Sequence, residues 1–247
     1  MRRHYSIHGF RRQWASSSAW NDVAAYLAGT QAAVLTPTAG TTYYIVSTSA
    51  QDATGGSGVD KVRIVYLNAT GHLATKEVTL NGLTAVSVGN DISFVQWMES
   101  WHSTTGQRVA AGDISITSTN GAAAETTTVE RIRSGGNKSQ SGRFKVPTGT
   151  HAHLVDYHAG AVKTSGGSAQ YDVELRATIF NDDNSLSNAF HFVRGTYVQD
   201  GNNFSDDLHD KEIPAGAIIK LSVIPTSVAD GNIFKCIVDV IVVDDYS

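Results

Sequence analysis

The feature of this sequence that most constrains its fold is a long series of short apolar runs separated by turn-forming residues. From Thr41 onward, runs rich in Val, Ile, Thr, Tyr and Phe alternate with clusters of Gly, Asn, Asp and Ser. This pattern is typical of β-strands joined by tight turns. No amphipathic stretch of about 10 to 15 residues separates the runs, which argues against a parallel sheet with crossover helices. The sequence therefore predicts an all-β protein of antiparallel strands.

The runs fall into two series on either side of a Gly- and Ser-rich stretch at 134–142, which has no large apolar residue and is expected to be a linker. We expect strands at 43–49, 61–67, 74–80, 85–88, 92–98, 114–118 and 126–131, and then at 143–146, 151–158, 169–179, 189–198, 218–225 and 234–243. We predict two antiparallel β-sandwich or jelly-roll-like domains preceded by an extended N-terminal arm. The expected boundaries are 1–40 for the arm, 41–133 for the first sandwich, 134–142 for the linker and 143–247 for the second sandwich or jelly roll.

Turn chemistry gives more local expectations. Asn81-Gly82 is expected to form a two-residue hairpin with Gly82 at positive φ. In the segment 61–67, alternation of apolar and polar side chains predicts one buried face. The best helical candidate is a turn or two at 20–27, where Ser18 could act as the cap.

Composition excludes several classes of protein. Charged residues make up only 17% of the 247 residues, and no apolar run approaches the roughly 20 residues of a membrane-spanning helix. The first residues carry two adjacent arginines without an apolar run behind them, so a signal peptide is not expected. The single cysteine, Cys236, cannot form an intramolecular disulfide and is expected to be a small buried side chain.

The N-terminal segment combines large aromatic side chains with arginines. Burying such aromatics is worth about 25 cal/mol per Å² of apolar surface, so the segment must pack against something. It either folds back on its own domain or docks on a neighbouring subunit. Residues 1–40 carry a net charge of +3 and residues 142–247 one of −6, which suits head-to-tail contacts between copies. Nucleic acid is not expected as a partner, because four arginines on an acidic protein are a weak footprint. The predicted partner-binding residues are Arg2, Arg3, Tyr5, Phe10, Arg11, Arg12, Trp14 and Trp20.

Candidate reactive residues do not converge in the sequence. On a strand His151 and His153 face one side, where they could present two imidazoles to a metal ion, whereas His158 is expected on the other side. A cupin-like set also needs acidic and histidine ligands further on, and these are missing. The oxygen-rich stretch 181–184 is expected to be a turn rather than a calcium site. The group Asp206, Asp207 and Asp210 could also hold calcium, but it does not match the loop of an EF-hand. The Gly55–Gly58 and Lys138-Ser139 segments lack the flanks of a nucleophile elbow or phosphate loop. We therefore expect no catalytic residue, metal site or cofactor, and no enzyme.

One block of the sequence resembles a group of tailed-bacteriophage virion proteins. The resemblance rests on STSAQD at 47–52, GGSGV at 55–59, VRIVYLN at 62–68 and EVTLNGLTAV at 77–86, with IHGFRR at 7–12 in the arm and the turn VPTG at 146–149. The linker and the region around His151 depart from the pattern. The resemblance implies a structural component of a phage particle, with a head decoration or cement protein as the preferred placement. It implies the major capsid protein or other virion proteins as partners, together with copies of the chain itself, most simply as a trimer. The expected location is the virion, assembled in the host cytoplasm.

Two other classes stay open. A tail, baseplate or fibre component would use the same β-domains and present a carbohydrate-binding face, such as one involving Tyr197, Asn202 and Asp206. A metal-dependent jelly-roll enzyme using His151 and His153 is the third alternative.

Overall fold

The described part of the chain is built from β-strands. The computed structural model describes residues 1–12, 21–24, 35–162, 170–178, 194–199, 203–207, 212–225 and 233–245. Within these ranges the chain forms seventeen strands, and every strand pairing is antiparallel. No helix in those ranges is long and apolar enough to cross a membrane. The all-β fold class predicted from the strand-and-turn pattern is confirmed.

The chain divides into two compact units. One unit is a continuous segment, 35–140, and the other combines 1–34 with 141–247, so the first unit is an insertion into the second. The boundary after Gln140 lies within the stretch predicted as a linker. Most of that stretch is hydrogen-bonded to the inserted unit. Backbone hydrogen bonds of Ser100 and Ser139 hold residues 137–139 along the edge of β7. A free edge strand offers unpaired backbone groups, and a polar segment can satisfy them.

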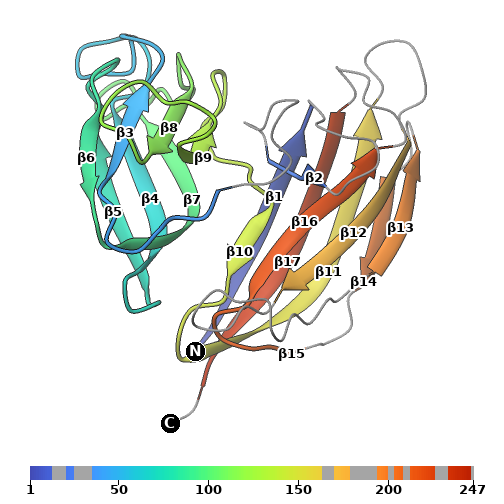
Figure 1. The fold of residues 1–247 in the computed structure, drawn as a ribbon. Coiled ribbons are helices and arrows are strands. Elements are labelled where there is room, and N and C mark those ends of the chain that lie inside the picture. Colours follow the sequence, from blue (N-terminus) through green and yellow to red (C-terminus); the bar gives the residue numbers. More distant parts are fainter. Residues whose placement is uncertain are drawn as a thin grey trace. The chain divides into compact units, whose positions relative to one another are not determined.

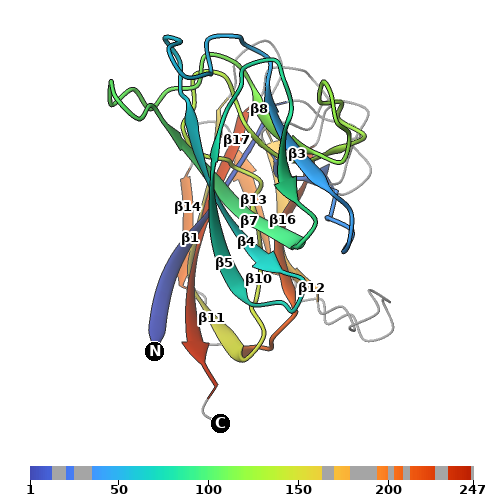
Figure 2. The same ribbon diagram turned by 90° about the vertical axis from the view of Figure 1, so that its left-hand side faces the viewer.

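The inserted unit is a sandwich of two sheets (Figure 1). Four strands form one sheet in the order β6-β3-β8-β9, and three form the other in the order β5-β4-β7; Figure 2 shows β4, β5 and β7 from another side. Aliphatic and aromatic side chains from both sheets form its core. The strands are β3 (Tyr43–Ser47), β4 (Lys61–Asn68), β5 (Leu73–Thr79), β6 (Val86–Gly89), β7 (Ile92–Trp101), β8 (Ile114–Thr117) and β9 (Thr128–Ile132).

Strand β4 shows how the sequence pattern produces this sandwich. Val62 and Ile64 are fully buried whereas Arg63 between them is exposed, as the alternation predicts. The turn after β4 is held by Asn68, whose side-chain oxygen accepts hydrogen bonds from the backbone of Thr70 and His72. That turn joins β4 to β5 as a hairpin, and this short connection fixes the register of the two strands.

The glycine-rich loop at 55–58 wraps around a buried carboxylate. Asp52 is fully buried and accepts hydrogen bonds from Ser47 Oγ and from three backbone amides, at 2.6 to 3.1 Å. A Cβ on Gly58 would lie 2.2 Å from Asp52 Oδ1, so only glycine fits there. The amide of Gly82 also donates to the backbone oxygen of Asp52. Segments of the sequence block that carries the phage resemblance therefore meet around one carboxylate.

Asn81-Gly82 forms a tight turn in which the amide of Thr84 donates to the backbone oxygen of Asn81, but the strands on its two sides do not pair as the predicted hairpin. Gly82 has φ +56°, as expected for this dipeptide. However, the strands on its two sides, β5 and β6, belong to different sheets, so the turn carries the chain from one layer to the other. The hairpin assignment was wrong because the apolar alternation gives each strand a buried face but does not say which sheet it joins.

The second unit is a two-layer sandwich with ten strands. We call the sheet β1-β17-β11-β14, with β15 paired to β11, the terminal sheet, and the sheet β10-β16-β12-β13, with β2 paired to β16, the facing sheet. From β10 to β17 the chain crosses repeatedly between these sheets, which is the winding of a jelly roll. The strands are β1 (Arg2–Arg11), β2 (Asn21–Asp22), β10 (Arg143–Lys145), β11 (Thr150–Val162), β12 (Gln170–Thr178), β13 (Arg194–Gln199), β14 (Asn203–Asp207), β15 (Glu212–Ile213), β16 (Ile218–Pro225) and β17 (Ile233–Asp244).

The segment expected as an extended arm is in part a strand of this sandwich. Over its ten residues β1 pairs with β17, from Arg2 opposite Val243 to Arg11 opposite Phe234. Both termini consequently lie at the same end of the unit (Figure 1). A helical turn is expected at 20–27. The described residues there form a strand instead, because Asn21 and Asp22 pair with β16 as strand β2.

Candidate functional site

The predicted partner-binding residues are divided between the two sides of β1. Burial alternates along the strand, so that Arg3, Tyr5 and Arg11 point into the sandwich while Arg2 lies on the opposite, outward side. The ring of Tyr5 packs 5.3 Å from that of Phe144 in the facing sheet. Phe10 is also buried, and Lys235 Nζ lies 5.9 Å from its ring centroid. Arg12 follows the strand and is exposed, and Trp14 and Trp20 lie outside the described residues.

Arg11 is held inside its own unit. Its side chain is fully buried and donates a hydrogen bond of 2.6 Å to the backbone oxygen of Asp22. The carboxylate of Asp22 is itself paired with Lys220 Nζ at 2.9 Å and accepts a hydrogen bond from Ser222. A buried guanidinium that loses its hydrogen-bond acceptor is left uncompensated, which is strongly destabilising. Arg11 is therefore a structural residue that fixes β1 and β2 to the sandwich.

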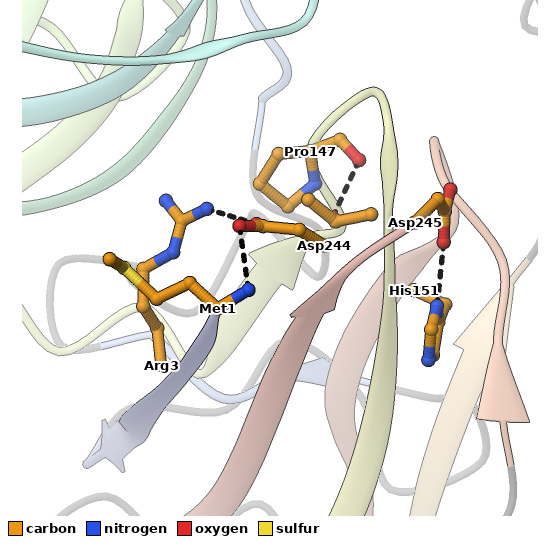
Figure 3. Close-up of polar contacts among 7 residues, drawn as sticks. Met1, Arg3, Pro147, His151, Asp244 and Asp245 are labelled. Carbon is orange, nitrogen blue, oxygen red and sulfur yellow. Dashed lines mark hydrogen bonds and ion pairs between the residues drawn. The ribbon is translucent and has the colours of Figure 1, made fainter. Parts of the chain in front are cut away.

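The polar contacts at the chain ends are drawn in Figure 3. Asp244, the last residue of β17, accepts a hydrogen bond from Arg3 and forms an ion pair with the amine of Met1 at 3.1 Å. Hydrogen bonds from this amine and from Arg3 lower the pKa of Asp244. His151 Nδ1 lies 2.6 Å from Asp245. Arg3, predicted to contact another molecule, thus contacts its own chain.

The outward side of the terminal sheet collects most of the histidines. We call this surface the histidine face. Strand β17 lies at the centre of this face. Val238 and Val240 point inward, whereas Ile237 and Ile241 are half-buried on the outward side, with Asp239 between them. Five of the nine histidines lie on its two neighbours, β1 and β11. The face consists of Arg2, His4, Ser6 and His8 from β1, Ile237, Asp239, Ile241 and Val243 from β17, and His151, His153, Asp156 and His158 from β11.

The histidines of β11 are arranged differently from the expectation. The sequence places His158 on the opposite side from His151 and His153, because residues an odd number apart alternate. The pairing of β11 with β17 shifts register between Leu154 and Asp156, and such a bulge reverses the alternation. All three imidazoles therefore lie on the same side of the sheet. The rings of His151 and His153 meet edge to face at 5.1 Å.

Other sequence candidates are not gathered into a site. Cys236 is buried as expected, and desolvation raises the pKa of its thiol. The stretch 181–184, Asn202 and Asp210 lie outside the described residues, whereas Tyr197 is in β13 and Asp206 in β14, on different sheets.

A second surface was not predicted from the sequence. On the outward side of sheet β5-β4-β7, Trp97 and Trp101 project from β7 with Glu99 between them. The guanidinium of Arg63 lies 5.4 Å from the ring centroid of Trp101, and Lys138 Nζ lies 5.7 Å from that of Trp97. We call this surface the tryptophan face. The alternation in the sequence WMESW, with Met98 and Ser100 buried, was the signal that could have revealed it.

Comparisons with known proteins give no family for this chain. No protein-family model matches it, and no curated protein matches it. A structure of infectious bursal disease virus, Gx strain, is 8% identical over 98% of this chain and 71% of the other, with a TM-score of 0.30. The VP2 subviral particle of the same virus gives 9% identity, 97% and 71% coverage and a TM-score of 0.29. The CBM22-1-CBM22-2 tandem domain of Paenibacillus barcinonensis Xyn10C gives 10% identity, 96% and 93% coverage and a TM-score of 0.27. Similarity at TM-scores this low supports no inference about function.

Proposed function

We propose that this protein is a structural component of a bacteriophage particle, and more specifically a decoration or cement protein that binds and stabilises the assembled head. The sequence block that resembles phage virion proteins supports this proposal. Its segments build the loops around Asp52 and the turn at Gly82, so the resemblance concerns one architectural feature of the inserted sandwich. A structural role also suits two sandwiches with separate cores.

The observation that carries the proposal is the group of half-buried aliphatic side chains that flank Asp239 on the outward side of β17. Half-buried aliphatic side chains on the outward side of a strand are typical of a sheet that is covered on both sides. On the histidine face, Ile237 and Ile241 lie on the central strand on either side of Asp239, and histidines and Arg2 lie on the neighbouring strands. Aliphatic side chains with polar groups around them are typical of a protein interface. Because acidic and basic groups lie on the same face, the occupant we propose is a further copy of this chain in a closed cyclic assembly, most simply a trimer.

Two measurements test this function. Mass spectrometry and electron microscopy of purified particles should find the protein on the head in many copies, and its absence from particles would refute the virion role. Light scattering of the isolated chain should show an oligomer that Ile241→Lys converts to monomers, while Thr75→Lys, on an exposed position of β5, leaves the assembly intact. A wild-type chain that is monomeric at all concentrations would refute the histidine face as a contact between copies.

The tryptophan face favours a second candidate function, a tail or fibre component that binds carbohydrate. Two tryptophans four residues apart on one side of a strand stand about 13 Å apart, given about 3.3 Å per residue. Rigid aromatic rings pack against the apolar faces of sugars, and nearby Arg63 and Glu99 supply polar contacts. A glycan array probed with the wild type and with Trp101→Ala tests this function. Equal signals for both proteins, or none for either, would argue against it.

A further inference from the structure

Two carboxylates lie directly opposite one another at the centre of the histidine face. Asp156 of β11 and Asp239 of β17 are register partners, and both are half-buried. Like charges at directly opposed positions of an antiparallel pair repel each other and destabilise the sheet. The position therefore requires a positive charge close to both carboxylates.

The bulge in β11 is what creates this pairing. Val155 is left out of the register and is 40% exposed, whereas Leu154 before it and Tyr157 after it are both buried. Without the bulge, alternation would turn Asp156 into the sandwich and separate it from Asp239. Bulges redirect side chains and are frequent next to functional sites. Here the bulge brings Asp156 and His158 to the same side as Asp239.

These three residues have the composition and spacing of a metal site. One ligand atom from each of Asp156, His158 and Asp239 lies within 4.8 Å of the others. His158 Nε2 is 2.7 Å from Asp156 Oδ2. Bonds from Zn²⁺ to such ligands measure about 2.0 to 2.2 Å, so small side-chain rotations would close the three atoms around one ion. An imidazole with two carboxylates favours a transition metal over the all-oxygen sites of Ca²⁺ and Mg²⁺.

Neighbouring groups hold the carboxylates in place. The backbone amide of Tyr157 donates a hydrogen bond of 2.7 Å to the second oxygen of Asp156. Ser6 Oγ donates one of 2.6 Å to Asp239 Oδ1. Hydrogen bonds of this kind orient metal ligands and tune their affinity. His4 Nε2 lies 3.6 Å from Asp239 Oδ1, and its side chain is 58% exposed, so it has room to rotate toward the cluster.

We propose that Asp156, His158 and Asp239 bind a Zn²⁺ ion, with His4 of β1 supplying the fourth ligand. The ligands come from three adjacent strands of the terminal sheet. The ion would neutralise the opposed carboxylates and clip the N-terminal strand to β17 and β11. Metal binding of this kind stabilises the folded state, because the unfolded chain does not hold the ligands together. The site is independent of whether the chain assembles on a particle.

The test is a titration of the metal-stripped full chain with Zn²⁺ by calorimetry, with Co²⁺ absorption as a readout of coordination geometry. The wild type should bind one ion per chain, and Co²⁺ should give the spectrum of a tetrahedral site. Asp239→Asn and His158→Gln should each weaken binding by about tenfold or more, and His4→Gln should weaken it less. His72→Gln, in the hairpin turn of the inserted unit, is the matched control and should bind like the wild type.

Thermal unfolding gives a second, independent measurement of Zn²⁺ binding. Zn²⁺ should raise the Tm of the wild type and of His72→Gln but not that of Asp239→Asn. Circular dichroism of each variant without metal verifies that it is folded. Absence of Zn²⁺ binding by the wild type, or equal binding by the wild type and the Asp239 and His158 variants, would overturn the proposal. A wild-type Tm that does not respond to Zn²⁺ would overturn it too.

Discussion

At the scale of single residues, Asp52 does the most to organise the inserted unit. Its carboxylate accepts hydrogen bonds from Ser47 Oγ and from the amides of Val59, Ala111 and Gly112. Asp52→Asn keeps the shape but replaces one acceptor oxygen by an NH2 group, which would face donors. A buried donor without an acceptor costs about 1 to 3 kcal/mol, so we expect the free energy of unfolding to fall by about 2 to 3 kcal/mol.

Urea unfolding followed by tryptophan fluorescence measures this change. Asp113→Asn is a suitable control, because it makes the same substitution at a more exposed carboxylate. Asp113 forms an ion pair with Arg131 at 3.5 Å. Ion pairs at such positions contribute about 0 to 1 kcal/mol. Equal losses in the two variants would contradict the role assigned to Asp52.

Gly82 is the second residue whose replacement has a definite expected result. It has φ +56°, and a Cβ there would lie 3.0 Å from the Cα of Ala50. Gly82→Val should therefore lower the free energy of unfolding by about 1 to 2 kcal/mol, because β-branched residues do not adopt this conformation without strain. Gly121→Val is the control, since Gly121 has no positive φ and nothing lies within 4 Å of its added Cβ. A neutral Gly82→Val in thermal unfolding would contradict this account.

At the scale of elements, the sequence predicted strands best where apolar residues alternate between turn signals. Every strand from β3 to β13 overlaps an expected run, as do β16 and β17. The missed strands, β1, β2, β14 and β15, are short or lack a clear alternation. β1 is the instructive case, because its partner β17 lies at the other end of the chain. Pairing over that separation leaves no local trace in the sequence.

The same limit applies to the candidate site. Residue type identified the histidines of β11 and the arm residues as candidates. It did not predict on which side of the strand each side chain lies. Whether His158 shares a side with His153 depends on one bulge at Val155. The sequence alone does not show the carboxylate and the backbone oxygen that Arg3 and Arg11 reach inside their own unit.

Strand β1 leads to a prediction about deletion of the N-terminus. Removing residues 1–12 removes the buried side chains of Ile7 and Phe10, which are 5% and 7% exposed. Burial of two such side chains is worth about 3 to 6 kcal/mol, so we expect a large loss of thermal stability. The deletion also uncovers the edge of β17, an apolar strand, and should promote aggregation. It therefore does not leave the two intact domains that an independent arm would leave.

The fall in Tm and the appearance of aggregates by light scattering check this expectation. Arg2→Ala, at an exposed position of the same strand, controls for a change that leaves the pairing in place. A truncated protein that unfolds at the wild-type temperature would show that β1 contributes little to the terminal sheet.

At the scale of the whole molecule, the chain is one sandwich interrupted by another. An insertion of this kind is tolerated only when the inserted part folds around its own core. Residues 35–140 meet that condition, because their two sheets enclose buried side chains such as Ile45, Ile64, Met98 and Ile114.

The excised segment 35–140 should therefore be folded and unfold cooperatively, as circular dichroism and dispersed amide resonances would show. A substitution within this segment should have the same effect in both contexts. Asp52→Asn should therefore lower the free energy of unfolding of the excised unit and of the full chain by similar amounts. If the excised segment is molten, or if Asp52→Asn affects only the full chain, the inserted sandwich depends on the rest of the molecule for its structure.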